Sequence, residues 1–176
     1  MNYESLLFSI GVIVKYLIAY GYCMNKYVSA VCEELSSILF VEESDIKENS
    51  SLINDLGADS LDVIDLTFNL SKKFKITMPT KSVFAHADEI LTENVLSRLL
   101  NGDVLTQEGK GLLINSCYHY TEEQLDSINT LSDVFGETNV HNWASLCQAV
   151  CESNGKTADE IIIDEIRRYC PEISSQ

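Results

Sequence analysis

The feature that most constrains the fold is the segment 56–66, in which a tight turn becomes an amphipathic helix. Gly57 marks the turn, Asp59 and Ser60 stand where the helix begins, and apolar residues follow at helical spacing. The first turn of a helix has unpaired backbone N–H groups and the positive end of the helix dipole. A serine hydroxyl held there can carry a phosphodiester, although serine and aspartate are also favoured there as ordinary helix caps.

Residues on both sides of this segment extend the pattern. Apolar anchors precede the turn, and an apolar-proline turn follows the helix. The positions that make up the pattern are Leu52, Leu56, Asp59, Ser60, Leu61, Phe74, Ile76, Met78 and Pro79. Together they resemble the acyl carrier protein family. The resemblance implies an all-α, four-helix bundle in which Ser60 receives a covalent 4'-phosphopantetheine arm from a phosphopantetheinyl transferase.

The same resemblance implies a carrier, not an enzyme, that holds acyl groups as thioesters for fatty acid or specialised lipid or polyketide biosynthesis. Its partners would be acyl-loading and acyl-processing enzymes, synthases and acyltransferases, with basic docking surfaces. The expected docking residues are Asp59, Leu61, Asp62 and Asp65. A solvated helix face explains these acids equally well in isolation. Many family members continue the helix with further acids, whereas this chain has Ser71-Lys72-Lys73.

Apolar residues on and after the same helix are expected to line a pocket for the acyl chain, where burial is favourable by about 0.8 kcal/mol per methylene group. The candidates are Val63, Ile64, Phe68, Leu70 and Ile76. Packing of an ordinary core predicts the same residues. The extra length of the chain suggests that an insertion enlarges or caps this pocket.

Charge and cysteine content narrow the class of protein. The formal net charge of -15 excludes nucleic acid as a partner, because phosphates would repel the chain, and favours basic protein surfaces. The cysteines form no Cys-x-x-Cys pair, so a reduced, cytoplasmic setting is expected. Cys117 and His119 are close together but no second pair follows, so no metal site is expected.

Helical periodicity and caps divide the chain into five parts. Residues 25–40 form the first core helix, and a polar loop at 44–50 follows, with Ile46 and Leu52 turned inward. Two capping boxes, at 121–124 and 157–160, open later helices, the first with Leu125, Ile128 and Leu131 on one side. The expected parts are an apolar extension at 1–23, a carrier core at 24–79, an insertion at 80–136, a closing core helix at 137–153 and a C-terminal helix at 154–176.

Two assignments of the closing helix compete. In the first, residues 140–150 around Trp143 close the bundle after a cap at Thr138 or Asn139, and the stretch 101–109 resembles the insertion of longer, specialised acyl carrier proteins. In the second, residues 92–100 close the bundle and everything after them is an appendage. The first is favoured because the apolar positions around Trp143 make a better core-facing helix.

The N-terminal run from Leu6 to Cys23 is apolar enough for a membrane span to be considered. Glu4 stands where a secretory signal needs basic residues. Three interpretations of this run stay open: a packed helix, a membrane-surface anchor, or an artefact of the choice of translation start site, because the carrier-like portion begins at Met24. Membrane contact through residues 6–23 is not favoured.

Three alternative functions also stay open. An aminoacyl or peptidyl carrier is the nearest, although such modules commonly have Gly-Gly before the His/Asp-Ser pair. A carrier-like adaptor would bind partners without cargo. A serine hydrolase would use Ser60 as nucleophile, but the glycine that a nucleophile elbow needs two residues later is missing. The histidines, His86, His119 and His141, have no recognisable triad context.

Overall fold

The chain folds into packed helices with one very short hairpin, which confirms the predicted all-α class. The computed structural model describes residue 24 and residues 26–171. After a helix over residues 26–39 come η1 (Glu43–Asp45), α2 (Ser60–Phe74), α3 (Val83–Ile90), α4 (Glu93–Leu99), α5 (Gln107–Ile114), α6 (Glu122–Ser127), α7 (Leu131–Glu137), α8 (Val140–Glu152) and α9 (Ala158–Tyr169). The hairpin joins β1 (Leu100–Asn101) to β2 (Val104–Leu105). Within the described part of the chain, no helix has the length and apolarity to cross a membrane. The expectations for residues 1–23 lie outside the described residues.

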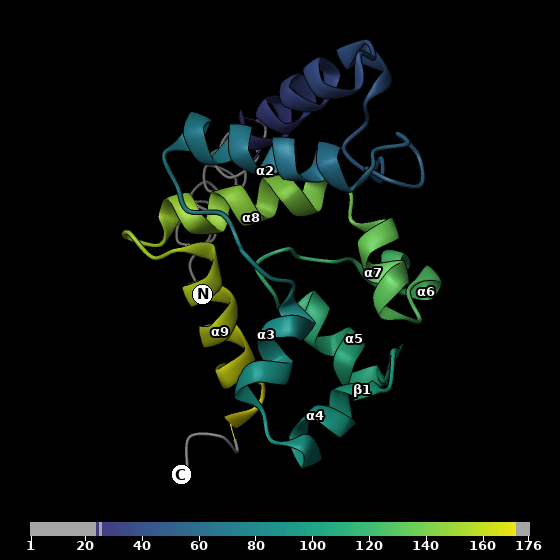
Figure 1. The fold of residues 1–176 in the computed structure, drawn as a ribbon, viewed down its shortest axis with the longest axis vertical. Helices are drawn as coiled ribbons and strands as arrows, with labels where there is room; N and C mark the ends of the chain where they lie inside the picture. The colour runs from purple at the N-terminus through teal and green to yellow at the C-terminus, as the bar shows by residue number, and fades with distance from the viewer. Residues whose placement is uncertain (1–23, 25, 172–176) are drawn as a thin grey trace, which may run out of the picture.

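In one half of the molecule, the helix over residues 26–39 lies beside α2, and α2 lies against α8 (Figure 1). The rings of Tyr27 and Phe74 join the first two helices, with their centroids 5.1 Å apart. Lys73 adds ion pairs to Glu33 at 2.7 Å and Glu34 at 2.9 Å. The basic end of α2, which departs from the family's acidic pattern, therefore contacts the first helix.

Helix α8 is the most deeply buried helix of this half. Buried residues occur around its whole circumference, including Ala144, Leu146 and Cys147, which are all 0% exposed. A helix that buries residues on all sides must be covered by neighbouring elements on each side. Accordingly, α8 packs against both α2 and α9. Asn139 caps it with a capping box to Asn142, at one of the two residues expected from the sequence.

The other half of the molecule holds α3, α4, α5 and α9 (Figure 1). Helix α4, the rival candidate for the closing helix, packs mainly on α5, β1 and α3, whereas α8 lies against α2. The approach of α5 to α4 needs Gly109, because a Cβ there would collide with the backbone carbonyl of Leu99. Helix α9 packs on α3 and α8, and its Ile162 and Ile166 are fully buried. Its predicted capping box from Thr157 to Glu160 is present.

The single helix expected after the box at 121–124 is wrong. The box is present, but α6 ends at Ser127 and α7 begins at Leu131. Thr130 opens a new capping box with Asp133, and the segment between the two helices pairs with the hairpin. Leu105 N–H donates to the Asn129 carbonyl at 2.8 Å, and Val104 bridges to Thr130. Tertiary pairing of the backbone therefore interrupts the helical pattern.

Candidate functional site

Ser60 is the first residue of α2, and its hydroxyl is not used to cap the helix. Asp59 is the N-cap, and its carboxylate accepts hydrogen bonds from the N–H groups of Leu61 at 2.7 Å and Asp62 at 3.1 Å. Asp62 completes the capping box by accepting from Asp59 N–H at 2.8 Å. The alternative of a capping serine is therefore wrong. Ser60 is exposed, and its side chain makes no hydrogen bond to any residue that the structure describes.

A tight turn positions this serine. Gly57 has a φ of 72°, a left-handed conformation that favours glycine. Its N–H donates to the Ile53 carbonyl at 3.1 Å, and Ala58 N–H donates to the Leu52 carbonyl at 2.8 Å. Leu52 anchors the turn in the core and is 2% exposed. Gly57 thus reverses the chain immediately before the helix that carries Ser60.

The loop before the serine is bonded to the start of α8. Leu52 N–H donates to the Thr138 carbonyl at 3.2 Å, and Val140 N–H donates to the Ser50 carbonyl at 3.1 Å. Nearby, the Asn54 side-chain amide donates to Glu137 at 2.9 Å. The segments at 50–54 and 137–140, far apart in sequence, therefore form one support beside the N-terminus of α2.

The faces of α2 differ sharply in what they contact. Leu66 and Leu70 are fully buried in the core. Leu61, Ile64 and Phe68 are respectively 67%, 60% and 56% exposed, which is unusual for large apolar side chains. Among the acids of the motif, Asp59 and Asp65 are exposed and Asp62 is half-buried.

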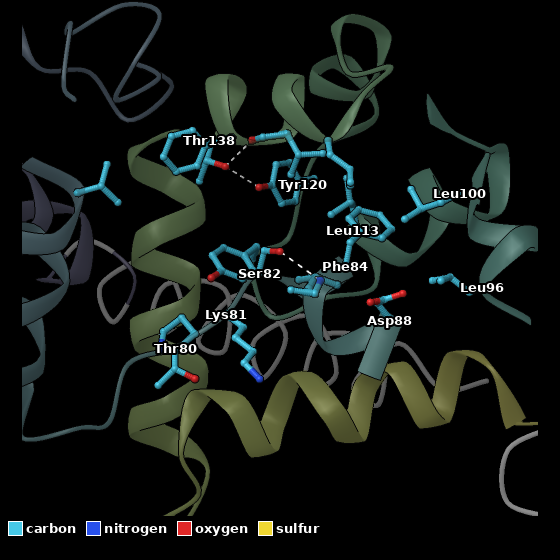
Figure 2. A pocket seen from close by; sticks show the side chains of 18 of the residues that line it. Thr80, Lys81, Ser82, Phe84, Asp88, Leu96, Leu100, Leu113, Tyr120 and Thr138 are labelled. Atoms are coloured by element: carbon cyan, nitrogen blue, oxygen red, sulfur yellow. Dashed lines mark hydrogen bonds between the residues drawn. The ribbon is translucent and has the colours of Figure 1, made fainter. Parts of the chain in front are cut away.

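A large cleft lies between α2 and the segment that follows it. Its volume is about 760 Å³, within the range of roughly 300–1,000 Å³ typical of small-molecule sites. Apolar side chains from several elements make up most of its wall. They include Leu52, Ile53, Val63, Val83, Phe84, Leu96, Leu100, Leu113, Leu131, Val134, Phe135 and Trp143. Figure 2 shows Thr80 and Lys81 toward one end of this cleft, and Leu96 and Leu100 toward the other.

Only Val63 of the five expected pocket residues lines this cleft. Ile64 and Phe68 point to solvent, Leu70 packs in the core, and Ile76 is half-buried against the core. The apolar residues of α2 occupy more than one face, so they cannot all reach the same cavity. Sequence spacing identifies an apolar helix but does not say which apolar face meets which neighbour.

Two tyrosines supply polar groups to the cleft that sequence reasoning missed. The Tyr120 hydroxyl and the Thr138 hydroxyl are 2.6 Å apart, and Thr138 also donates to the Val134 carbonyl at 2.7 Å (Figure 2). Burial raises the pKa values of Tyr118 and Tyr120 far above their ordinary value, so both phenols are protonated at neutral pH. No local sequence motif identifies these tyrosines as cleft residues, because they lie in a loop that folding brings to the cleft.

The histidines do not form a catalytic or metal site with Ser60. His86 Nε2 contacts Asp159 at 2.8 Å, and His141 Nδ1 contacts Glu48 at 2.8 Å. Burial, followed by the charge of His141, lowers the pKa of His119. Across the described residues, no group of three or more histidine, cysteine or acidic side chains is arranged to hold a metal ion.

Comparison with known proteins fits this geometry. A family model for the phosphopantetheine attachment site matches residues 29–88, a stretch that includes Ser60 and ends within α3. The acyl carrier protein of Prochlorococcus marinus (strain MIT 9515) is 42% identical over 58 residues, which cover 33% of this chain and 72% of that relative. No solved structure gives a significant match.

The cofactor of such a domain is a covalently attached 4'-phosphopantetheine. The exposed hydroxyl at the N-terminus of α2 fits this attachment. Proteins of this kind are carriers without catalytic activity, and their partners are a phosphopantetheinyl transferase and acyl-processing enzymes. On the evidence of the attachment-site match and of the similarity over most of a known carrier, this chain belongs to the acyl carrier protein family.

Proposed function

We propose that Ser60 carries the 4'-phosphopantetheine arm and that the protein serves fatty acid or specialised lipid biosynthesis in the cytoplasm. The observation that carries the assignment is the arrangement of hydrogen bonds at the start of α2. Asp59 accepts hydrogen bonds from the N–H groups of Leu61 and Asp62, and the adjacent Ser60 hydroxyl is exposed and bonds to no residue that the structure describes. The buried, unpaired thiols of Cys32, Cys117 and Cys147 support a reducing compartment.

The arm's terminal thiol supplies the thioester chemistry when the protein is loaded. The chain's own contribution is to present one hydroxyl at a fixed position. The turn at Gly57 and the backbone hydrogen bonds between residues 50–52 and 138–140 hold that position. A rigid attachment point lets a partner enzyme find the arm in the same place on every encounter.

The decisive experiment is loading of the purified chain with coenzyme A and a broad-specificity transferase, followed by intact-protein mass spectrometry. We expect the arm on the wild type and on Ser127→Ala, an exposed serine elsewhere, and none on Ser60→Ala. Loading that persists in Ser60→Ala, or a folded wild type that stays bare, would overturn the assignment.

The exposed face of α2 is the proposed docking surface for partner enzymes. Leu61, Ile64 and Phe68 form an apolar strip beside the carboxylate of Asp65. Asp59 and Asp62 lie at its beginning, although both also cap the helix. An apolar strip flanked by acids suits a basic partner surface, in which charge guides the encounter and apolar contact stabilises it.

Charge reversal tests this surface. Asp65→Lys is expected to slow transferase loading at low salt by about tenfold, within the range of electrostatic steering. Glu123→Lys makes the same change in net charge on an exposed residue of α6 and serves as the control. Equal loading rates for the two variants would contradict the docking proposal.

The proposed closing helix of the carrier bundle is α8. Its burial on all sides, its packing on α2 and its bonds to the serine loop support this role. The stretch matched by the family model extends into α3, so we propose that the inserted elements run from α4 to α7 and begin later than residue 80.

A further inference from the structure

Phe40 projects into solvent immediately after the helix over residues 26–39. Its side chain is 94% exposed, the largest exposed fraction among the large apolar residues that the structure describes as exposed. Its φ is 56°, a left-handed conformation that glycine or asparagine usually adopts at the end of a helix. Most residues with a Cβ are strained in this conformation. Neither burial nor backbone conformation therefore explains a phenylalanine at this position.

The residues around Phe40 fix its backbone. Leu39 and Val41, on either side of it, pack against the core. The Ser36 hydroxyl donates a hydrogen bond to the Val41 carbonyl at 2.6 Å. Farther along, Ile46 is 7% exposed and anchors the loop that follows. An aromatic side chain on a fixed backbone loses little conformational freedom when a partner covers it. Phe40 is therefore preorganised for contact with another molecule.

The surface beside Phe40 is acidic. Its exposed carboxylates belong to Glu42, Glu43, Asp45 and Glu48, and Lys47 is the one basic residue between positions 41 and 50. The C-terminal end of the helix over residues 26–39 adds the negative end of its dipole. A complementary partner has an apolar pocket with a basic rim. Like charge disfavours a second copy of this acidic chain and an anionic lipid surface.

The position of Phe40 indicates which basic partner this is. The helix over residues 26–39 ends, and α2 with Ser60 begins, at the same side of the molecule (Figure 1). A transferase must bring its reacting phosphate to the Ser60 oxygen itself, whereas acyl-processing enzymes need to reach only the far end of the arm. A typical interface covers about 800 Å² and 20–30 residues on each partner. The transferase interface is therefore expected to extend beyond α2.

We propose that Phe40 is an anchor for the phosphopantetheinyl transferase and inserts its ring into an apolar pocket with a basic rim on that enzyme. The proposal rests on attachment of the arm at Ser60. It adds a contact on a different element from the docking surface proposed on α2. A preorganised aromatic residue surrounded by charge is a common form of binding hot spot.

Loading kinetics of the full chain test the anchor. The chain is incubated with coenzyme A and the phosphopantetheinyl transferase of the same cells, and loading is timed by intact-protein mass spectrometry at several chain concentrations. Phe40→Asn removes the ring but tolerates the left-handed conformation. We expect it to lower kcat/KM by about 10–30-fold, mainly through a higher KM. Phe40→Tyr keeps the ring and should load almost as well as the wild type. Val104→Asn, at an exposed apolar residue of β2, is the matched control and should load normally.

Salt dependence and stability separate the anchor from other effects. Glu42→Lys should slow loading at low salt and less so at high salt, whereas the loss in Phe40→Asn should persist, because salt screens charges and not apolar contact. The urea midpoint of Phe40→Asn should equal or exceed that of the wild type, because the ring is exposed and asparagine suits the left-handed conformation.

The outcomes distinguish this inference from the proposed function. A folded wild type that takes no arm at Ser60 contradicts the proposed function itself. If the wild type is loaded and Phe40→Asn has the same kcat/KM, the anchor alone is overturned. Slower loading of Phe40→Asn together with a lower urea midpoint also overturns it, because Phe40 would then be a structural residue.

Discussion

Replacement of Asn142 by leucine tests whether the inserted elements and the carrier core fold as one unit. Asn142 is 0% exposed and lies at the start of α8. Its side-chain carbonyl accepts hydrogen bonds from the Asn139 backbone N–H at 2.9 Å and from the Gln124 side-chain amide at 2.9 Å. Its side-chain amide donates to the Tyr118 backbone carbonyl at 2.9 Å. One side chain thus joins α8 to the start of α6 and to the loop before it.

The expected loss of stability follows from the groups left behind. Leucine has a similar size but can neither donate nor accept. The Asn139 N–H and the Tyr118 carbonyl therefore lose this partner, and the Gln124 amide keeps only its bond to the Glu137 carbonyl. Each buried unsatisfied group costs about 1–3 kcal/mol. Partial relaxation reduces the sum, and we expect a loss of about 3–5 kcal/mol, a large part of the roughly 5–15 kcal/mol that stabilises a typical domain.

Urea unfolding measures this loss with two probes. Far-UV circular dichroism reports all helices, and fluorescence of Trp143, the one tryptophan of the sequence, reports the start of α8. We expect coincident transitions in the wild type. Asn94→Leu, at an exposed position, should change stability by no more than about 0.5 kcal/mol.

A double-mutant cycle sharpens the test. Asn142→Ala and Gln124→Ala remove the two ends of one hydrogen bond, and we expect them to be non-additive by about 1 kcal/mol. Additive losses, or a loss below about 1 kcal/mol for Asn142→Leu, would refute the idea that this residue couples the insertion to the core.

Three further predictions concern the turn at Gly57, the hydrogen bonds of the Asp159 carboxylate, and the thiols of Cys147 and Cys151. Gly57→Ala should lower stability to urea by about 1 kcal/mol, because its left-handed conformation strains any residue with a Cβ although space is available; unchanged stability would count against the turn. Burial by itself would raise the pKa of Asp159, but hydrogen bonds from neighbouring side chains and backbone outweigh it, so the pKa is lowered. The contribution of this carboxylate to the free energy of unfolding is therefore complete above its unfolded pKa of about 3.9, and it is lost as the pH falls through the lower folded pKa. Asp159→Ala should therefore cost about 1–3 kcal/mol at neutral pH and progressively less in acid, and a gap independent of pH would contradict this. Burial raises the pKa of Cys147 to about 12, so iodoacetamide should modify the exposed Cys151 in the native protein and Cys147 only in urea; equal native rates, read by peptide mass mapping, would be inconsistent with the buried thiol.

Local patterns in the sequence predicted the site more fully than they predicted its surroundings. Caps depend on residues three positions apart, so the boxes at 121–124 and 157–160 and the cap at Asn139 could be identified without tertiary information. The beginning of α2 at Ser60 was predicted for the same reason. The sequence did not reveal that Asp59 takes the capping role, because both residues of the pair are good caps.

Features that depend on distant contacts escaped prediction. The break between α6 and α7 arises from pairing with β2. The exposure of Ile64 and Phe68 depends on which neighbours cover α2, and an apolar pattern alone cannot specify them. The cleft is lined by residues between 52 and 143, so no contiguous motif describes it.

The most direct measurement is mass spectrometry of the intact chain purified from its own cells, followed by peptide mapping. Attachment at Ser60 predicts a mass increase equal to phosphopantetheine, alone or with an acyl group on its thiol, located on the peptide that contains this serine. A folded chain with an unmodified Ser60 peptide, or with the arm on another residue, would contradict the central claim.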